Sequence, residues 1–287
     1  MMFGLSLVTQ SCKKMEDEDG NPLVNVDVNE GGLNGPRYLA YEMANGDSAI
    51  SVYRYNGLKL NMVINGQNIK TITYNGDMIN RINFTGKVAN DSISYAQYFT
   101  YNNAGKIVSI AETRAVYDTL GVNTKNFKTL YNMFYSNTSG KVDSITMKRG
   151  QQLAGQPFAY NEYSIAKLDY FLPGTAYIGN VQKIKKSKGA IDAAGNFGPI
   201  MEEFEYAFDD YDDKISPYVL LPFGYNLHYM LEDDLAGYRL SPNNPKMFTI
   251  TGDTLPAAIT QSTTYTYDPQ KYALTGFFGI NYLYRPF

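Results

Sequence analysis

The chain has 287 residues and a mass of 32.2 kDa, which is enough for one large domain or two ordinary ones. Hydrophobic residues are 44% of it and charged residues 18%, which excludes a disordered chain, and no window approaches the run of about 18 apolar residues that a membrane-spanning helix needs. The net charge of −3 argues against nucleic acid as a partner, and the single cysteine excludes an internal disulfide or a cysteine-cluster metal site. With 26 Tyr, 15 Phe, 25 Gly and no Trp, the composition favours strands joined by tight turns.

A short apolar run at the amino terminus ends in the only cysteine. Residues 2–11 precede Cys12, and a Ser-Cys junction after such a run is typical of a lipoprotein signal peptide, in which the cysteine is lipidated and becomes the first mature residue. Thr9 stands where an aliphatic residue is usual, and no basic residue precedes the run, so we expect the signal to start further upstream. The sequence therefore predicts a signal peptide over residues 1–11 and lipid attachment at Cys12. The alternative is a buried or incidental cysteine.

Charged residues follow the cysteine. Lys13 and Lys14 precede the acidic residues 16–19, a pattern similar to the surface-export signal of Bacteroidetes lipoproteins. A solvated leash is the alternative interpretation, and the two are compatible. We expect residues 12–35 to form a flexible tether and residues 36–287 a single β-repeat domain.

Asn-Gly pairs recur at regular spacing in the first third of the chain. Asn-Gly is the strongest short hairpin signal, because a type I′ turn needs positive φ at both central positions. The pairs lie at residues 34–35, 45–46, 56–57, 65–66 and 75–76, and they separate short segments rich in Tyr, Ile, Val and Thr at residues 37–44, 48–55, 58–64 and 68–74. The pattern predicts an antiparallel meander of hairpins.

A looser repeat continues the meander. Each unit has an aromatic-x-aromatic triplet, an Asn- or Asp-led turn, Gly, Lys and a β-branched strand, and units occur at residues 53–60, 99–110, 134–145 and, less completely, 84–88 and 265–272. Gly supplies the left-handed position of the turn, and the aromatic rings stack across neighbouring strands. Residues 67–74 lack a clean apolar face. We therefore expect an all-β fold with one long curved sheet, partly wet on one side.

A basic stretch lies in the second half of the chain. Residues 183–188 read Lys-Ile-Lys-Lys-Ser-Lys and precede the glycine-rich residues 189–198. The acidic net charge favours a strand end entering a loop over a nucleic-acid contact. We expect no nucleic acid as a partner.

Acidic residues are the next candidates for chemistry. Glu202 and Glu203 are adjacent on a predicted strand and so point to opposite faces, which argues against a glycosidase pair. Four aspartates could hold Ca²⁺ through oxygen ligands, but they fit no loop template and are interpreted as an acidic turn. They are Asp209, Asp210, Asp212 and Asp213.

The organisation changes after Phe208. Residues 218–235 are rich in Leu, Tyr and Met, which predicts a short helical or irregular insertion, interrupted by Pro222 and Gly224. The only histidine, His228, lies there, and a lone histidine is more often structural than catalytic.

Short motifs in the last third of the chain point to a family. The sequence has an Asp-x-Lys-x-x-Pro-Tyr segment, a Leu-Ser-x-Asn-Asn loop and a closing Tyr-x-Tyr-Asp strand. Together with the repeats, these resemble a group of Bacteroidetes lipoproteins of unknown function with degenerate Tyr-Asp (Rhs-like) β repeats. The resemblance covers roughly residues 36–287 and implies a fold and an outer-membrane address, without an agreed active site. The matching residues are Asp212, Lys214, Pro217, Tyr218, Leu240, Ser241, Asn243, Asn244, Tyr265, Tyr267 and Asp268.

Two classes of function fit these observations. The sequence has no Gly-x-Ser-x-Gly, no His-Glu-x-x-His and no phosphate-binding loop, so we expect no enzyme, no cofactor and no metal site. The first class is a lipoprotein of the outer membrane, exposed at the cell surface, that binds a glycan or a protein through tyrosine-rich faces, although most tyrosines are interpreted as structural pairs. The second class is a repeat scaffold without a small ligand.

A small outer-membrane β-barrel is a third interpretation, suggested by alternating apolar residues at the end of the chain. Against it, Arg54, Lys70 and Arg81 lie in mid-strand with no apolar band around them. The sequence does not single out ligand-binding residues.

Overall fold

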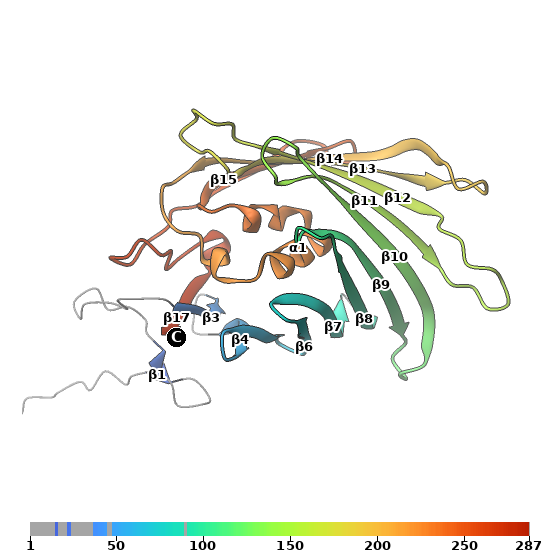
Figure 1. The fold of residues 1–287 in the computed structure, drawn as a ribbon, viewed down its shortest axis with the longest axis horizontal. Coiled ribbons are helices and arrows are strands. Elements are labelled where there is room, and N and C mark those ends of the chain that lie inside the picture. The colour runs from blue at the N-terminus through green and yellow to red at the C-terminus, as the bar shows by residue number, and fades with distance from the viewer. Residues whose placement is uncertain (1–14, 17–21, 24–36, 45–47, 89–90, 287) are drawn as a thin grey trace, which may run out of the picture.

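One antiparallel sheet contains fifteen of the described strands (Figure 1). The computed structural model describes residues 15–16, 22–23, 37–44, 48–88 and 91–286. The strands are β3 (Arg37–Met43), β4 (Ala49–Asn56), β5 (Lys59–Asn65), β6 (Asn68–Asn75), β7 (Met78–Val88), β8 (Asp91–Tyr101), β9 (Ile107–Tyr117), β10 (Asn123–Tyr135), β11 (Val142–Gln151), β12 (Glu162–Tyr170), β13 (Val181–Ile191), β14 (Phe197–Tyr211), β15 (Pro245–Gly252), β16 (Ile259–Ser262) and β17 (Asn281–Pro286).

The strand order confirms the predicted meander. Each strand from β3 to β16 pairs with the next one along the chain, and β17 returns to pair with β3. Strands β16 and β17 are the two ends of the sheet, and the sheet is not closed. The two-residue strands β1 (Met15–Glu16) and β2 (Pro22–Leu23) pair with each other within the segment expected to be a tether.

The sheet curls around a helical insertion, residues 217–240 (Figure 1). This insertion confirms the expectation for residues 218–235 and consists of η1 (Pro217–Leu220), α1 (Phe223–Glu232) and η2 (Asp234–Leu240). Pro222 is the N-cap of α1 rather than an interruption. Gly224 lies in its first turn, where a Cβ would come within 3.3 Å of Ile79 and Ile107, so the glycine permits close packing on the sheet.

The core lies between the insertion and the concave face of the sheet, which is the face turned toward α1. Buried residues of almost every strand meet Tyr225, Leu227 and Met230 of α1 in one cluster. Strand β6 contributes only Ile72 as a buried residue, in agreement with its weak apolar face. No helix in the described part of the chain is long and apolar enough to cross a bilayer.

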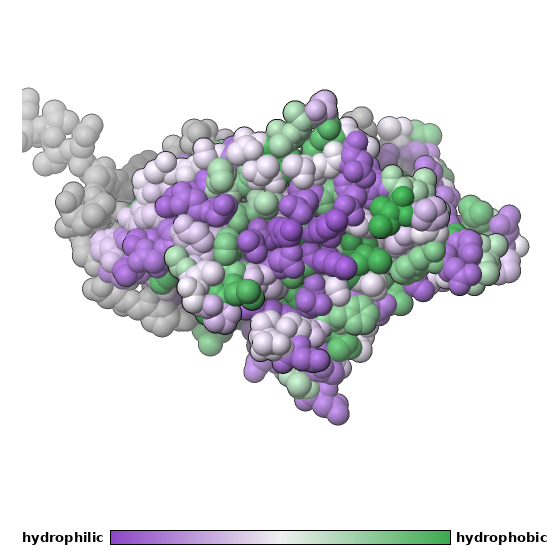
Figure 2. Space-filling model, turned by 90° about the horizontal axis from the view of Figure 1, so that it is seen from above, coloured by the Kyte–Doolittle hydropathy of each residue, from purple (hydrophilic) through white to green (hydrophobic). Residues whose placement is uncertain are grey.

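The outer face of the sheet is polar where it can be followed over β13 and β14. Lys185 pairs with Glu203 at 2.8 Å and Lys183 with Glu205 at 3.3 Å, both on the face opposite to buried Ile184. Seen from above, hydrophilic residues occupy the middle of the visible surface (Figure 2). The basic stretch 183–188 thus lies inside β13, which continues to Ile191, and the prediction of a strand end at this place was wrong.

The Asn-Gly turns form where they were predicted, but with a different geometry. Asn56 pairs with Lys59, so Gly57 and Leu58 are the two central residues of the turn. Only the glycine has positive φ, +58°, as in a type II′ turn, and the turns at Gly66 and Gly76 repeat this value. The expectation of type I′ turns was therefore wrong by one residue of register. The Asn-Gly pairs at 34–35 and 45–46 lie outside the described residues.

In the looser repeat, residues 84–88 lie inside β7, so the turn predicted there is wrong, and residues 53–60 contain the two-residue turn at Gly57. The units at 99–110 and 265–272 share a five-residue turn. At its first position Asn102 accepts hydrogen bonds from the amides of Ala104 and Lys106 at 3.0 Å, and Gly105 follows with φ of +73°. Asp118 and Asp192 lead turns of the same kind. Near the end of the chain Asp268 leads another, in which Lys271 takes the glycine's place at φ of +70°.

A tyrosine ladder explains the aromatic and lysine positions of the repeat. Each tyrosine hydroxyl donates a hydrogen bond of 2.8 to 2.9 Å to a backbone carbonyl on another strand; the donors are Tyr55, Tyr74, Tyr101, Tyr135 and Tyr211. The lysine after a turn glycine reaches the next turn: Lys106 donates to the carbonyl of Gly140 at 3.1 Å and lies 4.8 Å from the ring centre of Tyr135. These tyrosines are structural, as interpreted from the sequence for most of them.

Candidate functional site

The concave face changes from apolar to polar side chains along its strands. On β9, buried Ile110 is followed on the same face by Glu112 and Arg114. The same switch from apolar to charged or polar residues occurs from Met133 to Thr129 on β10, from Ile145 to Arg149 on β11 and from Ile184 to Lys188 on β13. The apolar positions pack against the helical insertion, and the polar positions lie where the strands extend beyond the end of α1 (Figure 1).

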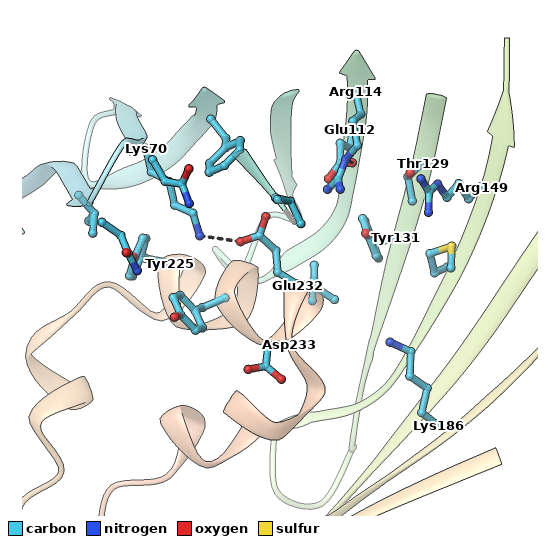
Figure 3. A pocket seen from close by; sticks show the side chains of 18 of the residues that line it. Lys70, Glu112, Arg114, Thr129, Tyr131, Arg149, Lys186, Tyr225, Glu232 and Asp233 are labelled. Atoms are coloured by element: carbon cyan, nitrogen blue, oxygen red, sulfur yellow. Dashed lines mark hydrogen bonds and ion pairs between the residues drawn. The ribbon is translucent and has the colours of Figure 1, made fainter. Parts of the chain in front are cut away.

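These polar positions and the carboxyl end of α1 enclose a cavity of about 520 Å³, here named the concave groove. Figure 3 shows Glu112, Arg114, Thr129 and Arg149 on the sheet, with Glu232 and Asp233 at the end of the helix. The groove is lined by residues of β4 to β7, β9 to β13 and α1, among them Lys70, Phe84, Glu112, Arg114, Thr129, Tyr131, Met147, Arg149, Glu162, Lys186, Lys188, Tyr229, Glu232 and Asp233.

Strand register places four polar residues in one row across the groove. Glu112 lies opposite Thr129, Thr129 opposite Arg149, and Arg149 opposite Glu162. Neighbouring strands are about 4.8 Å apart, so an acidic, a hydroxyl, a basic and a second acidic group follow one another at regular intervals. Glu112 and Thr129 are buried, whereas the side chains of Arg149 and Glu162 are partly exposed.

Both arginines of the groove are fixed by a carboxylate and an aromatic ring. Arg114 Nε donates to Glu112 at 2.8 Å, and its guanidinium lies 4.8 Å from the ring centre of Tyr95. Arg149 Nε lies 3.7 Å from Glu162, and its guanidinium lies 4.3 Å from the ring centre of Phe127. Stacking and ion pairing hold planar guanidinium groups in one orientation, which prepares their remaining N–H groups to donate to another molecule.

The helix contributes a second set of fixed charges. Lys70 donates to Glu232 at 2.6 Å, and the Tyr95 hydroxyl donates to the other oxygen of the same carboxylate. Burial opposes the ionisation of Glu232, but the His228 ring, the Lys70 ammonium and the two hydrogen bonds outweigh it and lower the pKa of Glu232 to about 2. Glu232 is therefore a carboxylate at neutral pH. Asp233 differs, because burial raises its pKa.

A buried chain of hydrogen bonds connects the helix to the row on the sheet. His228 Nδ1 donates to the amide oxygen of Gln97 at 2.8 Å, and Gln97 Nε2 donates to Glu112 at 2.7 Å. His228 and Gln97 are fully buried. Burial, and then the nearby Lys70 ammonium, lower the pKa of His228 to about 3, so the ring is neutral and its Nδ1 carries the proton. His228 thus does not line the groove and supports Glu112 from behind.

Two side chains of the groove have hydrogen-bonding capacity that the protein does not use. Within the described residues, the Tyr131 hydroxyl and the Arg149 guanidinium make no hydrogen bond. Burial, and then Glu112, raise the pKa of Tyr131, so its hydroxyl is protonated and can donate. Such groups, half-buried on the wall of a cavity, are ready to bind a ligand.

The other sequence candidates lie outside the groove lining. Cys12 is outside the described residues. Glu202 and Glu203 face opposite sides of β14, as predicted: Glu202 pairs with Lys188 at 2.8 Å, and Glu203 pairs with Lys185 on the outer face. Among the described residues, no group of three His, Cys, Asp or Glu side chains is placed to hold a metal ion.

The aspartates after Phe208 have different partners and do not form one site. Asp212 accepts from the Lys214 amide at 2.9 Å, from the Asn244 amide at 3.2 Å and from the Tyr267 hydroxyl. Asp213 pairs with Lys214 at 2.5 Å, whereas Asp210 lies 3.6 Å from Lys246. Asp209 and Asp210 lie at the end of β14, so the interpretation as an acidic turn was wrong for these two, and Asp212 forms part of a hydrogen-bonded junction.

That junction brings together the motifs on which the family resemblance rests. The side-chain amide of Asn243 donates to the carbonyl of Lys214 at 2.7 Å, and the backbone N–H of Asn243 donates to the side-chain oxygen of Asn180 at 3.0 Å. Asp268 forms a fully buried ion pair with Arg37. The motif residues thus join β3, the strand ends and the helical insertion, and their role in the described structure is to hold these segments together.

A second cavity, of about 540 Å³, lies at the amino end of α1 beside the tyrosine ladder. The hydroxyls of Tyr101 and Tyr135 and the ammonium groups of Lys106 and Lys141 on its wall all donate to backbone carbonyls. Because the protein already uses these groups, the concave groove is the better candidate site.

Sequence reasoning missed the groove. The available signal was the pattern Ile-x-Glu-x-Arg at 110–114, Ile-x-Met-x-Arg at 145–149 and Ile-x-Lys-x-Lys at 184–188, in which one strand face changes from apolar to charged. The groove's residues on the helix could not be assigned, because the register that brings α1 to these strands is not local.

Comparison with solved structures finds sixteen similar chains, among them two porin-like proteins. A porin-like protein from Bacteroides vulgatus superposes with a TM-score of 0.47 at 11% identity, covering 87% of this chain and 98% of that chain. A porin-like protein from Bacteroides uniformis has a TM-score of 0.36 at 12% identity, covering 85% of this chain and 93% of that chain. No family model and no curated protein sequence matches the chain.

Proposed function

We propose that this chain is a lipid-anchored protein of the outer membrane, exposed at the cell surface, that binds a ligand in the concave groove and catalyses no reaction. The address is supported by the Ser11-Cys12 junction after the amino-terminal apolar run and by the resemblance to Bacteroidetes lipoproteins. The binding role is supported by one observation above all, the switch of the concave face from apolar to fixed polar side chains where the helical insertion ends.

Fixed charges favour binding over a purely structural role. Glu112 is only 3% exposed and is held by Gln97 and Arg114. Desolvating a carboxylate is costly, and a solvated sheet end could present loose side chains instead. A scaffold without a ligand is the second candidate, and the tyrosine ladder favours it because that ladder uses most of the conspicuous tyrosines in backbone hydrogen bonds.

The charge states of the groove favour binding over catalysis. A general acid at neutral pH needs a raised pKa, whereas ion pairing lowers the pKa of Glu232. Burial raises the pKa of Asp233, but this carboxylate is the N-cap of η2 and accepts from the Leu235 amide at 3.1 Å. The imidazole of His228 is fully buried behind Gln97, where no substrate atom can reach it. Replacing His228 by Ala is expected to cost packing rather than a turnover, and a reaction that depends on His228 would contradict this part of the proposal.

The address is tested by Cys12→Ala, expressed with its complete signal sequence. We expect this variant to leave the membrane fraction and to keep the β-rich circular dichroism spectrum of the parent, because lipoprotein maturation adds more than one acyl chain and these chains provide the anchor. Retention of the variant in the membrane would refute lipid attachment at Cys12.

Replacing the acidic residues 16–19 by Ala is expected to reduce protease accessibility on whole cells without releasing the protein.

Ligand binding is tested by thermal shift of the mature chain against a panel of neutral and charged oligosaccharides and peptides. Arg149→Ala removes a groove cation, and Lys183→Ala is its matched control, because Lys183 lies on the outer face and its side chain is 37% exposed against 34% for Arg149. Binding raises Tm, so we expect at least one panel member to raise the Tm of the parent and of Lys183→Ala but not of Arg149→Ala. If no panel member shows this difference, the binding proposal is wrong.

A further inference from the structure

We propose that the concave groove binds an uncharged, polyhydroxylated chain, an oligosaccharide of neutral sugars, at Arg149, Glu162 and Tyr131. This inference rests on the proposed binding function and adds the chemical class of the ligand. Its basis is the charge balance, the hydrogen-bonding capacity and the shape of the groove.

The charge balance favours a neutral ligand. Each of the five cations of the groove lies within 3.7 Å of a carboxylate: the pairs are Lys70–Glu232, Arg114–Glu112, Arg149–Glu162, Lys186–Asp234 and Lys188–Glu202. A phosphate, sulfate or uronate would place a second negative charge beside a carboxylate that is already paired with its cation, and an amine would place a second positive charge beside a paired cation. The lining carboxylate outside these pairs, Asp233, accepts from the amide of Leu235 at 3.1 Å. A ligand without charge leaves all five pairs intact.

The hydrogen-bonding groups that the groove leaves unused complement the hydroxyl groups of a sugar. Arg149 and Tyr131 offer N–H and O–H donors, and Glu162, 49% exposed, offers an acceptor beside Arg149. A sugar hydroxyl is donor and acceptor at once, so it can bridge an arginine and the adjacent carboxylate of the row. Arg149 and Glu162 lie on neighbouring strands about 4.8 Å apart and are the exposed pair of the row, because Glu112 and Thr129 are only 3% and 4% exposed.

Aromatic rings supply the apolar contacts. Tyr131 and Tyr229, both partly buried, line the groove together with its charged residues, whereas Phe84 is 4% exposed and stacks on Tyr95. A sugar ring has an apolar C–H face and a polar rim, which suits an aromatic ring next to ionised side chains. A cavity of about 520 Å³ lies within the usual range for small-ligand sites.

The sheet geometry argues against a peptide. Extended peptides bind by adding a strand to a free sheet edge, where backbone N–H and C=O groups are available. The groove exposes the faces of β9, β10, β11 and β12, whose backbone groups are paired on both sides. Recognition in the groove therefore depends on side chains.

The test is saturation-transfer NMR with the mature chain and three sets of trisaccharides. The neutral probes are maltotriose, cellotriose, mannotriose and xylotriose, the anionic probe is tri-galacturonate, and the cationic probe is the glucosamine trimer. We expect saturation transfer to at least one neutral probe. Loss of hydrogen bonds from a charged donor should weaken that binding about tenfold or more in Arg149→Ala, and several-fold in Tyr131→Phe, with no change in Lys183→Ala.

Each result decides the inference. Arg149-dependent binding of a neutral probe supports it. Arg149-dependent binding of only a charged probe, or of a peptide from the thermal-shift panel, overturns the ligand class and leaves the proposed binding function standing. The absence of Arg149-dependent binding by any trisaccharide overturns the inference, and the thermal-shift panel then decides separately on the function. Tyr131→Phe keeps the test valid if Arg149→Ala does not fold.

Discussion

The concave face has two regions that share the same strands and differ in what covers them. In the covered region, the helical insertion packs on Ile110, Ile145 and Ile184, all nearly inaccessible. In the open region, four residues further along the same strands, Arg114, Arg149 and Lys188 line the concave groove. Where a strand extends beyond the helical insertion, its concave face is exposed to water or to a ligand. In this protein that part of the face consists of charged side chains that form ion pairs and stack on aromatic rings.

Charges also occur in the covered region, but there they are fully enclosed. Arg239 of the insertion lies between the rings of Tyr218 and Tyr229, at 3.9 and 4.0 Å from their centres, and donates to the Tyr53 hydroxyl at 3.0 Å. Its carboxylate partner, Glu42, also accepts from Tyr218 at 2.9 Å. The comparison shows that an arginine is structural in one region and available for binding in the other.

The largest difference in stability is expected between Arg239→Ala and Arg149→Ala, which replace one arginine in each region. Arg239→Ala leaves Glu42 buried without its cation and should lower the free energy of unfolding by about 3 to 5 kcal/mol. Arg149→Ala, at a side chain 34% exposed, should lower it by less than about 1 kcal/mol. Urea denaturation measures both, and equal losses would erase the distinction between the regions.

Two apolar residues on β11 offer the same comparison without charge. Ile145 is 2% exposed in the covered region, and Met147 is the next residue on that face. Ile145→Ala should cost about 2 to 5 kcal/mol because it leaves a cavity, and Met147→Ala about 1 kcal/mol because its site opens into the groove. The contrary outcome, a larger loss for Met147→Ala, would mean that the groove is a packed core.

Acid should destabilise the boundary between the regions through His228. The folded-state pKa of about 3 lies below the ordinary value of 6.5, so between these values the unfolded state binds the extra proton and stability falls with falling pH. At about 1.4 kcal/mol per pH unit, the loss from this group is roughly 2 to 3 kcal/mol by pH 4.5, and below that Glu232 adds to it. The urea midpoint of His228→Gln should vary less than that of the parent between pH 6.5 and 4.5. An unchanged pH dependence would show that His228 is not buried in its neutral form.

The smallest effect concerns two tyrosines of β10. The Tyr135 hydroxyl donates to the carbonyl of Ile107 at 2.9 Å, whereas the Tyr131 hydroxyl has no hydrogen bond within the described residues. Tyr135→Phe should therefore cost about 1 kcal/mol and Tyr131→Phe only a few tenths. Thermal denaturation of the two variants in parallel checks the difference, and a larger loss for Tyr131→Phe would argue that the groove tyrosine is structural.

Most of the fold could be predicted from local sequence signals. Asn-Gly pairs and β-branched segments placed β4, β5 and β6 within one residue of their observed bounds, because a two-residue hairpin is determined by adjacent residues. The predicted type of turn was wrong, since positive φ was expected at both Asn56 and Gly57 and only Gly57 has it. The insertion was recognised from its composition, but Pro222 was interpreted as an interruption and is instead the N-cap.

The site could not be predicted in the same way. Its contacts join residues far apart in the sequence: Gln97 and His228 are separated by 131 positions, Tyr95 and Glu232 by 137, and Lys70 and Glu232 by 162. Periodicity reports which face of a strand is apolar but not which segment covers it, and the sheet must curl before α1 reaches β6 and β8.

The most direct test of the groove as a binding site is NMR of the protein with ¹³C-labelled methionine methyl groups. Met147 lines the groove, Met133 is buried in the covered region, and Met201 is 74% exposed outside the groove lining. Titration with the trisaccharide or panel ligand that raises Tm should shift the Met147 methyl resonance and leave those of Met133 and Met201 in place. A saturating ligand that shifts Met201 and leaves Met147 unchanged would contradict the account.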